Sequence, residues 1–431
     1  MKEIRLKINY ILEYLIALYL IIGANSVYSR MLDFNLHINI LTLVTLYIYI
    51  LNKFFIKNSF KESIHYFKST TKKYYHFYII FFIYLIVFMI FNNIMEKNFF
   101  SLYLLILPML IFIYAEQKEV VKSMMKKIVV ITIALAIISL VLYLALEVLH
   151  IFNYDHSIKI SWGEERDIPS FLSIFFKTQY YVIQKRIVIR NTGIFAEAPM
   201  YSLILVLALC FYEFFLEDEN KLFVRTVLIL TIIMTFSTTG YISVILIYLF
   251  KIVPKIKIKS KFSKYIIIFI VAIATIICII LLGNRLKTNS GSVRVDDYKA
   301  AFKTWIHGNI INGVGFGNEE AIRNYMSEFR ENNKGLSNSL MVILAEGGIY
   351  LFLLYALPFV YTLIKSLKNK VYNRIYFIII LLFLFMTTIF FYTNTMVNIL
   401  ALGYAYIIRD RKYYNGNKLK NEKINNKKLY L

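Results

Sequence analysis

The chain has 431 residues, of which 59% are hydrophobic and 17% are charged, and its mean hydropathy is +0.62. This apolar content lies far above that of a water-soluble domain and excludes an ordinary soluble protein. The formal net charge of +23 would suggest nucleic-acid binding in a soluble protein, so the positions of the basic residues have to decide what the charge means.

Apolar windows of about 20 residues, the length that crosses a bilayer core, recur along almost the whole chain. We therefore predict an all-α integral membrane protein with about 12 transmembrane helices. The segment before the first window is basic, as in a secretory signal, but no small-residue cleavage site follows, so we expect a first helix there. The windows start at Ile8, Leu36, Phe77, Phe99, Ile128, Ile194, Leu222, Tyr241, Tyr265, Leu340, Tyr376 and Met396.

These windows and the connections between them predict six parts. They are an N-terminal bundle of five helices (1–150), a first long extracytoplasmic loop (151–193), four helices (194–283), a second long extracytoplasmic loop with amphipathic helices (284–338), three helices (339–409) and a basic cytoplasmic tail (410–431).

Basic residues cluster at both ends of the chain and in every second connection, whereas the other short connections carry almost none. By the positive-inside rule, both termini are then cytoplasmic. The positive net charge is then explained by this orientation and by contact with anionic lipid head groups of the bilayer. We predict no nucleic-acid partner.

Both long loops are predicted to lie on the outer face and to be partly helical. Connections of this length inside a compact fold are usually functional or disordered. In the second loop, apolar residues recur at three- and four-residue steps opposite a polar face with Arg294, Asp297 and Lys303, and a second amphipathic helix follows from Ile322 through Phe329. This pattern predicts a cap over the outer mouth of the bundle; the simpler alternative is two helices that only pack the loop down.

The stretch RNTGIFAEAP runs from Arg190 to Pro199, where a polar loop meets an apolar window. Proline is accepted in the first turn of a helix and disfavours helical geometry before it, so the helix is predicted to start at Pro199. Glu197 then lies just outside a helix N-terminus, where the helix dipole stabilises a carboxylate and Arg190 can pair with it. The alternatives are a helix-entry ion pair and a functional site in a water-filled cavity.

Three further stretches have special composition. NGVGFGN (312–318) is a glycine-rich turn in which Asn318 can cap a helix from Glu319; a dinucleotide site is unexpected because no strand precedes it. In SNSLMVILAEGGIY (337–350), two glycines interrupt a long apolar run, which suggests a half-helix followed by a full span. TFSTTGY (235–241) is predicted to be a tight outer turn. The histidines show no ligand spacing, so we expect no metal and no cofactor.

Taken in order, RNTGIFAEAP, TFSTTG, SVRVDDYKAAFKTW with INGVGFGN, and SNSLMVILAEGGIYLFLLY resemble the O-antigen polymerase and O-antigen ligase superfamily of bacterial envelope proteins. The resemblance covers Arg190 to Tyr355. It implies a polytopic glycosyltransferase that uses undecaprenyl-pyrophosphate-linked oligosaccharides at the outer face of the plasma membrane. Polymerases of the superfamily join repeat units, whereas ligases hand the finished chain to another acceptor.

Ligase-type members of this superfamily look like they carry a histidine just before the asparagine of the last motif. This chain has Ser337 before Asn338 instead. We therefore expect a polymerase for a capsule, O-antigen or exopolysaccharide, with a flippase and a chain-length regulator as candidate partners. A ligase-type glycan transferase is the alternative. A lipid-linked oligosaccharide flippase is an alternative of another class, but such transporters usually carry ionisable residues inside their spans and repeated halves.

The chemistry implied by this resemblance assigns roles to residues of both long loops. A departing lipid pyrophosphate needs fixed cations, and arginine matches phosphate oxygens bidentately, so Arg190 and Arg294 are the expected clamp. Glu197 is expected to act as general base or only to orient Arg190. The expected substrate contacts are Arg186, Lys303, Asn338 and the backbone N–H groups at Gly313 and Gly315.

Overall fold

The computed structural model describes residues 2–31, 34–55, 60–162, 164–183, 186–216, 221–255, 261–286, 289–330 and 335–410. Every apolar window of the sequence forms helix in this structure. Six helices are long and apolar enough to cross a membrane among the described residues, which agrees with an all-α membrane protein. The number of twelve spans stays a prediction.

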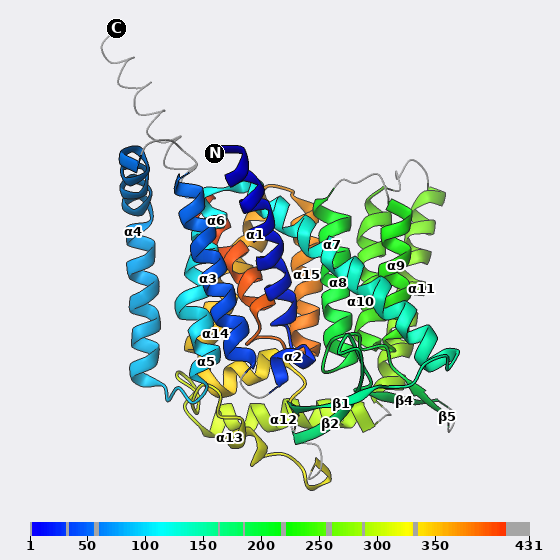
Figure 1. Cartoon of the computed structure of the whole chain (residues 1–431). Helices are drawn as coiled ribbons and strands as arrows, with labels where there is room; N and C mark the ends of the chain where they lie inside the picture. Colours follow the sequence, from blue (N-terminus) through cyan, green and yellow to red (C-terminus); the bar gives the residue numbers. More distant parts are fainter. Residues whose placement is uncertain are drawn as a thin grey trace.

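The helices of the bundle stand side by side, and the start of α1 lies at the same end of the bundle as the end of the helix 394–410 (Figure 1). Chain 394–410 forms a further helix at the C-terminal side. The bundle is made of α1 (Lys2–Ile22), α3 (Phe34–Phe55), α4 (Phe60–Phe91), α5 (Lys97–Ser101) with η1 (Leu102–Ile106) and α6 (Leu107–Glu116), α7 (Lys118–Tyr143) with η2 (Leu144–Val148), α8 (Ala198–Phe215), α9 (Lys221–Met234), α10 (Thr238–Ile252) with η3 (Val253–Lys255), α11 (Lys261–Leu286), α14 (Ser339–Lys368) and α15 (Tyr372–Thr387).

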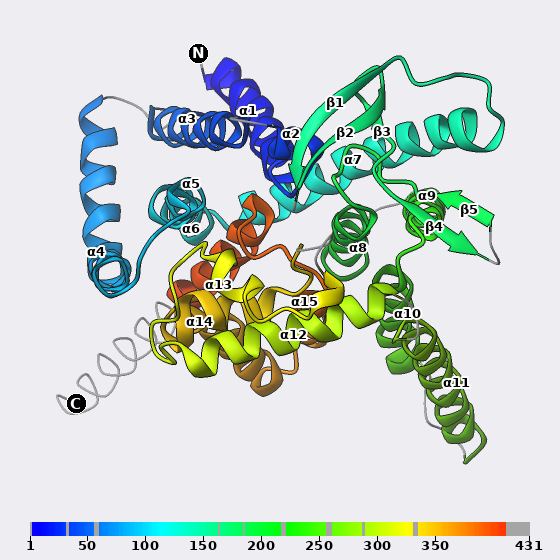
Figure 2. The same cartoon turned by 90° about the horizontal axis from the view of Figure 1, so that it is seen from below.

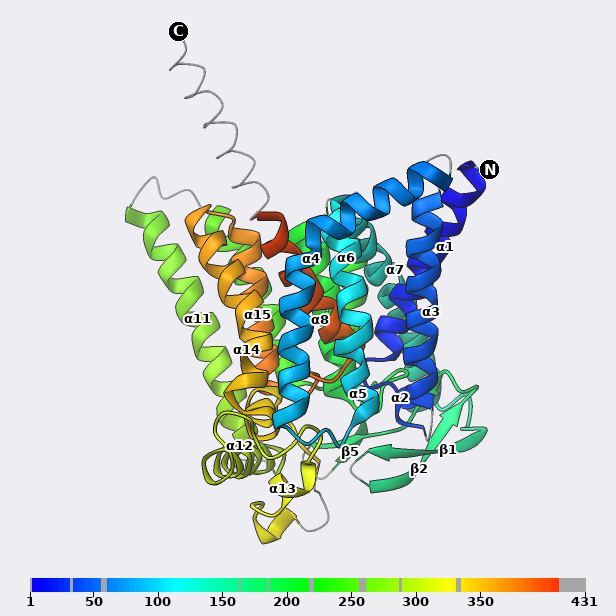
Figure 3. The ribbon, with the colours of Figure 1, turned by 90° about the vertical axis from the view of Figure 1, so that its left-hand side faces the viewer.

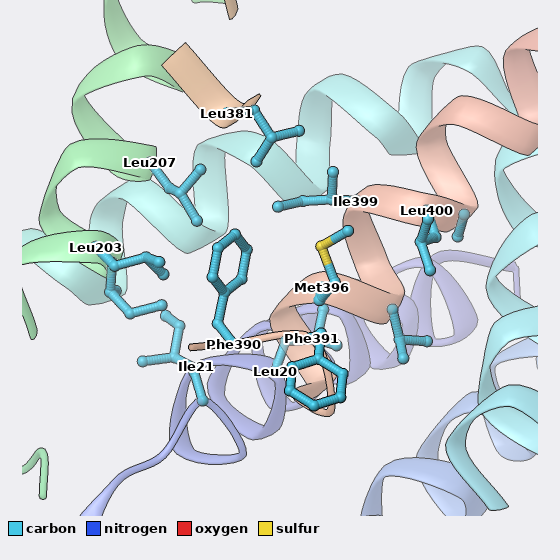
Figure 4. Close-up of a cluster of buried hydrophobic side chains, with 14 of the residues drawn as sticks. Leu20, Ile21, Leu203, Leu207, Leu381, Phe390, Phe391, Met396, Ile399 and Leu400 are labelled. Atoms are coloured by element: carbon cyan, nitrogen blue, oxygen red, sulfur yellow. The ribbon is translucent and has the colours of Figure 1, made fainter. Parts of the chain in front are cut away.

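The core of the bundle is built by apolar side chains from helices that are distant in sequence. Figure 4 shows Leu20 and Ile21 of α1 beside Leu203 and Leu207 of α8 and Met396 of the C-terminal helix. All five side chains are buried. This packing joins the N-terminal helices to the last helix and holds α1 and α8 close together at the end of the bundle where the two long loops lie. We call this end the outer end, after the orientation that the sequence predicts.

One charged pair inside the bundle joins two helices. The Lys127 ammonium contacts the Glu13 carboxylate, and both side chains are nearly inaccessible to solvent. Tyr49 donates a hydrogen bond to the same carboxylate at 3.0 Å. A buried charge is tolerated when its partner and its hydrogen bonds are present, so this pair ties α1 to α7 and α3.

The first outer loop is made of strands, so the prediction that both loops are partly helical was wrong for this one. β1 (His156–Trp162), β2 (Glu164–Phe171) and β3 (Phe175–Phe176) form one antiparallel sheet, and β4 (Tyr180–Ile183) pairs with β5 (Arg186–Ile189) in another. Ile158 lies opposite Ile168. The alternation of apolar and polar residues in β1 is the period-2 pattern of a half-buried strand.

The second outer loop begins with α12 (Asn289–His307), which lies across the outer ends of α14 and α15 (Figure 2). It continues with α13 (Glu319–Arg323) and a single 3-10 turn, η4 (Glu328–Arg330). The Asn318 side chain accepts a hydrogen bond from the Ala321 N–H at 3.2 Å, as expected for the cap. The predicted amphipathic helix from Ile322 through Phe329 was wrong, because α13 ends after five residues.

Helix α14 is broken near its outer end. At Gly348, φ is 59° and ψ is −162°, a conformation that is essentially restricted to glycine. The break separates a short helical piece that starts at Ser339 from the longer piece that continues to Lys368, in agreement with the half-helix expected from the two glycines. Figure 3 shows α14 beside α15, with α12 and α13 below their outer ends.

Candidate outer-face site

The RNTGIFAEAP motif is an irregular segment held from several sides. Residues 191–196 are all buried. The Ile194 carbonyl accepts a hydrogen bond from Val27 N–H at 2.8 Å, and the Asn25 carbonyl accepts one from Ala196 N–H at 3.1 Å. The Thr192 hydroxyl donates to the Phe176 carbonyl at 2.6 Å. The motif is therefore fixed to the connection after α1 and to β3 before it enters α8.

Arg190 is held by backbone carbonyls of the TFSTTG turn. Its Nε donates to the Thr235 carbonyl at 2.8 Å, and one terminal nitrogen donates to the Phe236 carbonyl at 3.1 Å. Phe236 adopts a left-handed conformation with φ of 48°. The turn after α9 therefore presents two carbonyls to the same guanidinium, and the remaining donors of this group are the ones that can face a ligand.

Gln179 links Arg190 to the start of α8. Its side-chain oxygen accepts hydrogen bonds from Arg190 at 3.2 Å and from the Ala198 N–H at 3.1 Å. Helix α8 begins at Ala198, one residue before the predicted start at Pro199, with Glu197 as its N-cap residue and Pro199 in the first turn. No sequence pattern singles out Gln179.

Arg294 is held at the end of a different helix. It projects from α12 and donates a hydrogen bond to the Thr387 carbonyl at the C-terminus of α15. Tyr298, one turn further along α12, donates to the neighbouring Met386 carbonyl. Carbonyls at a helix C-terminus lack intrahelical partners and attract cations, so α12 docks on α15 through these two side chains.

The three residues expected to be catalytic influence one another electrostatically although they come from three segments. Burial lowers the pKa of Arg190 to about 10, Glu197 raises it, and Arg294 lowers it further. Burial also lowers the pKa of Arg294, and Glu197 again opposes this shift. Glu197, the N-cap residue of α8, therefore acts electrostatically on both arginines.

Arg30 is a further cation of this region that the sequence reasoning missed. It ends the short helix α2 (Val27–Arg30) and donates to the Asn25 side chain. Burial lowers its pKa to about 10, while Glu319 and Glu197 raise it. A signal was present in the sequence, since Arg30 lies in one of the short outer connections that carry almost no basic residues.

An ion-pair cluster fixes α12 to the rest of the second loop. Arg330 is only 1% exposed and donates to the fully buried Asp297 carboxylate at 2.7 Å. Ser337 donates to the other oxygen of Asp297, and Ser327 N–H donates to Asp296 at 3.1 Å.

Burial raises the pKa of Asp297, and Ser337, Arg330 and Arg294 oppose the rise. Asp297 is thus not on the exposed polar face where the sequence placed it.

Asn338, an expected substrate contact, is 1% exposed and caps α14. Its side-chain oxygen accepts a hydrogen bond from Met341 N–H at 2.9 Å. Its side-chain amide nitrogen is buried without a hydrogen-bond partner among the residues that the structure describes. This residue therefore sits next to the Asp297 cluster with one donor that remains for another group.

The glycine-rich segment 309–317 fills the break in α14, and its N–H groups serve that packing. A Cβ atom on Gly313 would lie 2.4 Å from the Glu346 backbone, so only glycine fits. Four hydrogen bonds cross the break: Val314 N to Ala345 O (2.9 Å), Gly315 N to Glu346 O (3.1 Å), Ile349 N to Ile310 O (3.0 Å) and Tyr350 N to Ile311 O (2.9 Å).

These contacts overturn the expectation that Gly313 and Gly315 offer free N–H groups to a substrate. The Gly313 N–H donates to Asn309 at 2.6 Å, and the Gly315 N–H is used by α14. The Gly317 N–H donates to the Glu346 carboxylate at 2.9 Å. The motif instead satisfies the backbone groups that the break in α14 leaves open.

The two expected auxiliary cations differ in how they are placed. Arg186 begins β5, four residues before Arg190, and its side chain lies outside what the structure describes. Lys303 is exposed on α12. Nine residues separate it from Arg294, which is about two and a half helical turns, so Lys303 projects from the opposite side of the helix and is not brought to the site.

Comparison with known proteins supports the resemblance stated above. Residues 224–356 match the model of a family described as O-antigen ligase. Comparison with the curated proteins and with the solved structures gives no significant match. The matched region contains the TFSTTG turn, α12 with Arg294 and the glycine-rich segment, and it ends within α14. This part of the chain is therefore similar to the O-antigen ligase family, which supports the resemblance of the chain to the O-antigen polymerase and ligase superfamily.

Proposed function

We propose that this protein is a polysaccharide polymerase that joins undecaprenyl-pyrophosphate-linked oligosaccharide repeat units at the outer face of a bacterial plasma membrane, with both termini in the cytoplasm. The observation that carries the proposal is that Glu197, the N-cap residue of α8, opposes the fall that burial causes in the pKa of both Arg190 and Arg294. Two arginines from different outer loops, together with a carboxylate that acts on both, suit a transfer reaction with an anionic leaving group.

In the proposed reaction, the acceptor sugar hydroxyl attacks the anomeric carbon of the donor glycan. The bond from this carbon to the pyrophosphate oxygen breaks, and the lipid pyrophosphate departs with the bonding electrons. Arg190 and Arg294 stabilise the negative charge that develops on the leaving group, because guanidinium donors match phosphate oxygens. The carboxylate of Glu197 takes the hydroxyl proton or, in the alternative, only orients Arg190. No step requires a metal or a cofactor.

Two observations bear on the alternatives. Ser337 occupies the position before Asn338, and its hydroxyl is used by Asp297, which weakens a ligase-type glycan transferase with a base at that position. A flippase would carry unpaired ionisable groups along its path, whereas Glu13 and Lys127, inside the described part of the bundle, are paired with each other. A flippase and a chain-length regulator remain proposed partners of the polymerase.

The test uses a strain that lacks this gene and carries wild type, Arg190→Ala, Arg294→Ala or Glu197→Gln at matched membrane levels, with polymer length read on a glycan gel. We expect single repeat units from the deletion and from both arginine variants. Arg323→Ala is the matched control, because this arginine pairs with Glu319 on α13 with 32% of its side chain exposed.

Other outcomes would decide for the alternatives. Lipid-linked polymer that never reaches its acceptor means a ligase. Full-length polymer from both arginine variants would reduce Arg190 and Arg294 to structural residues. Glu197→Gln separates the two carboxylate roles: a general base predicts strong loss of polymer, whereas an orienting role predicts that the isosteric amide retains most of it. Purified protein in liposomes that moves lipid-linked oligosaccharides without joining them would indicate a flippase.

A further inference from the structure

A cavity of about 520 Å³ lies at the end of the bundle opposite the outer-face site. It is lined by the start of α7, the ends of α8 and α14, the start of α15 and the helix 394–410, at the end of the bundle where α1 starts (Figure 1). Its volume falls in the range of small-molecule sites, about 300–1,000 Å³. None of its lining residues belongs to the outer-face site.

The deep part of this cavity is apolar. Phe359 of α14, Phe377 of α15, and Met125 of α7 contribute to its wall, together with Ile399 of the last helix. Gly403 also lines it, and a Cβ atom there would lie 2.7 Å from Pro358, so this glycine lets the last helix approach α14 closely. Such walls suit a hydrocarbon chain and give a polar ligand no partners.

Four cationic side chains surround the opposite part of the cavity: Lys118, Lys122, Arg374 and Arg409. Both lysines are exposed and the two arginines are half-buried. The one carboxylate in the lining, Asp410, contacts the Lys365 ammonium at 2.8 Å and accepts a hydrogen bond from Tyr361 at 2.6 Å. The acidic charge of the lining is therefore already matched by Lys365, which leaves an excess of positive charge at the cavity.

The cations and the apolar wall are arranged along the helix axis. Ten residues separate Ile399 from Arg409 in one continuous helix, which corresponds to about 15 Å. Arg374 lies over the Tyr406 ring, with its central carbon 4.5 Å from the ring centre. This stacking holds the guanidinium at the level of the last helical turn. Positive charge thus gathers at one end of the cavity and hydrocarbon at the other.

We propose that this cavity binds an anionic phospholipid from the membrane leaflet at that end of the bundle. The phosphate head group lies among the four cations, and an acyl chain lies between Phe359, Phe377 and Ile399. Basic pockets between transmembrane helices on the cytoplasmic side are suited to such head groups. Free phosphate would leave the apolar wall in contact with water, and a neutral lipid would leave the positive charge unmatched.

The experiment measures lipids retained by the purified full-length protein with native mass spectrometry after addition of phosphatidylglycerol or phosphatidylcholine. The wild type is expected to retain phosphatidylglycerol preferentially. The double variant Lys122→Gln/Arg374→Gln should lose roughly tenfold or more of this retention, because each basic residue near an anionic head group contributes on the order of 1 kcal/mol. Lys368→Gln/Lys370→Gln is the matched control, since these lysines lie at the same end outside the cavity lining.

A second variant tests the apolar part. Leu402→Phe adds volume at a residue that lines the cavity and should reduce retention of phosphatidylglycerol while the four cations stay in place. An excess of inorganic phosphate should not displace the lipid. Equal retention of both lipids, displacement by inorganic phosphate, or unchanged retention in both test variants would overturn the proposal. The inference is independent of the proposed polymerase activity, because the assay contains no glycan substrate.

Discussion

The two outer loops hold their arginines by different means. In the first loop, Arg190 follows a small β-sheet and depends on three hydrogen bonds, to two carbonyls of one turn and to Gln179. In the second loop, Arg294 projects from a helix of 19 residues that is fixed by a buried ion pair between Asp297 and Arg330. The first loop supplies a locally held side chain, and the second supplies a rigid support.

This difference predicts how substitutions in each loop affect side-chain position and stability. Loss of a hydrogen bond in the first loop should move Arg190 and leave the fold intact. Loss of an ion pair or of a glycine in the second loop should loosen α12 and α14 as a unit. Substitutions in the two loops should separate local positioning from structural support.

Arg330→Met should produce the largest loss of stability. It leaves Asp297 buried without its ion-pair partner, and removal of one member of such a pair costs about 3–5 kcal/mol. Arg323→Met is the control, because the Arg323–Glu319 pair is partly exposed and such pairs contribute about 1 kcal/mol or less. Thermal unfolding of the purified proteins measures both effects. Equal shifts of the two midpoints would contradict the role of Asp297 and Arg330.

The loss in Arg330→Met should also depend on pH. Burial raises the pKa of Asp297 and Arg330 opposes this rise, so the pKa of this carboxyl in the folded variant should lie higher still. A carboxyl with a raised folded pKa contributes stability at low pH that is lost as the pH rises through that value. The difference in unfolding midpoint between wild type and variant should therefore shrink as the medium is acidified, and a constant difference would argue against protonation of Asp297.

Gly348→Ala should be nearly as destabilising, because the backbone conformation at this position and the space around it both require glycine. A Cβ atom would lie 2.2 Å from the Ile311 carbonyl oxygen, and the strained conformation adds about 1–3 kcal/mol. Gly283→Ala is the matched control, since nothing lies within 4 Å of a Cβ atom there. Unfolding midpoints that fall equally in both variants would contradict the proposed fit of the glycine-rich segment into α14.

Gln179→Leu should change activity more than stability. The variant loses the acceptor that connects Arg190 with the start of α8, so polymer formation should fall about tenfold, as expected for a displaced but present cation. The unfolding midpoint should change little, since one hydrogen bond contributes about 1 kcal/mol. Gln117→Leu, at the other end of the bundle, serves as the control. Unchanged polymer formation would show that Arg190 does not need this support.

Much of the bundle could be predicted from the sequence, because apolar windows of bilayer length form helices wherever they occur. The strands of the first outer loop were missed because their alternation covers only a few residues, as in His156–Trp162. Arg190 and Glu197 could be selected because Pro199 fixes the start of α8. Arg30 was missed although its place in a connection with almost no other basic residues was a signal. Gln179 could not be selected, since its relevance depends on contacts between segments that only the folded chain brings together.

For the glycine-rich segment, the sequence suggested a binding role that the fold does not leave available. Its composition suggested N–H groups for an anionic ligand, but those groups are used by the break in α14. A sequence reveals that glycine is required at Gly313, and it does not reveal whether a ligand or the protein's own backbone is the close neighbour.

Arg190 and Arg294 are proposed to act together on one leaving group, and a double-mutant cycle measures whether they do. Purified wild type, Arg190→Ala, Arg294→Ala and the double variant are reconstituted with lipid-linked oligosaccharides, and the initial rate of polymer formation is measured. If the arginines form one clamp, each single variant should lose about 100-fold or more, and the double variant should lose little beyond that. Losses that simply multiply, or a single variant with wild-type rate, would contradict a shared site.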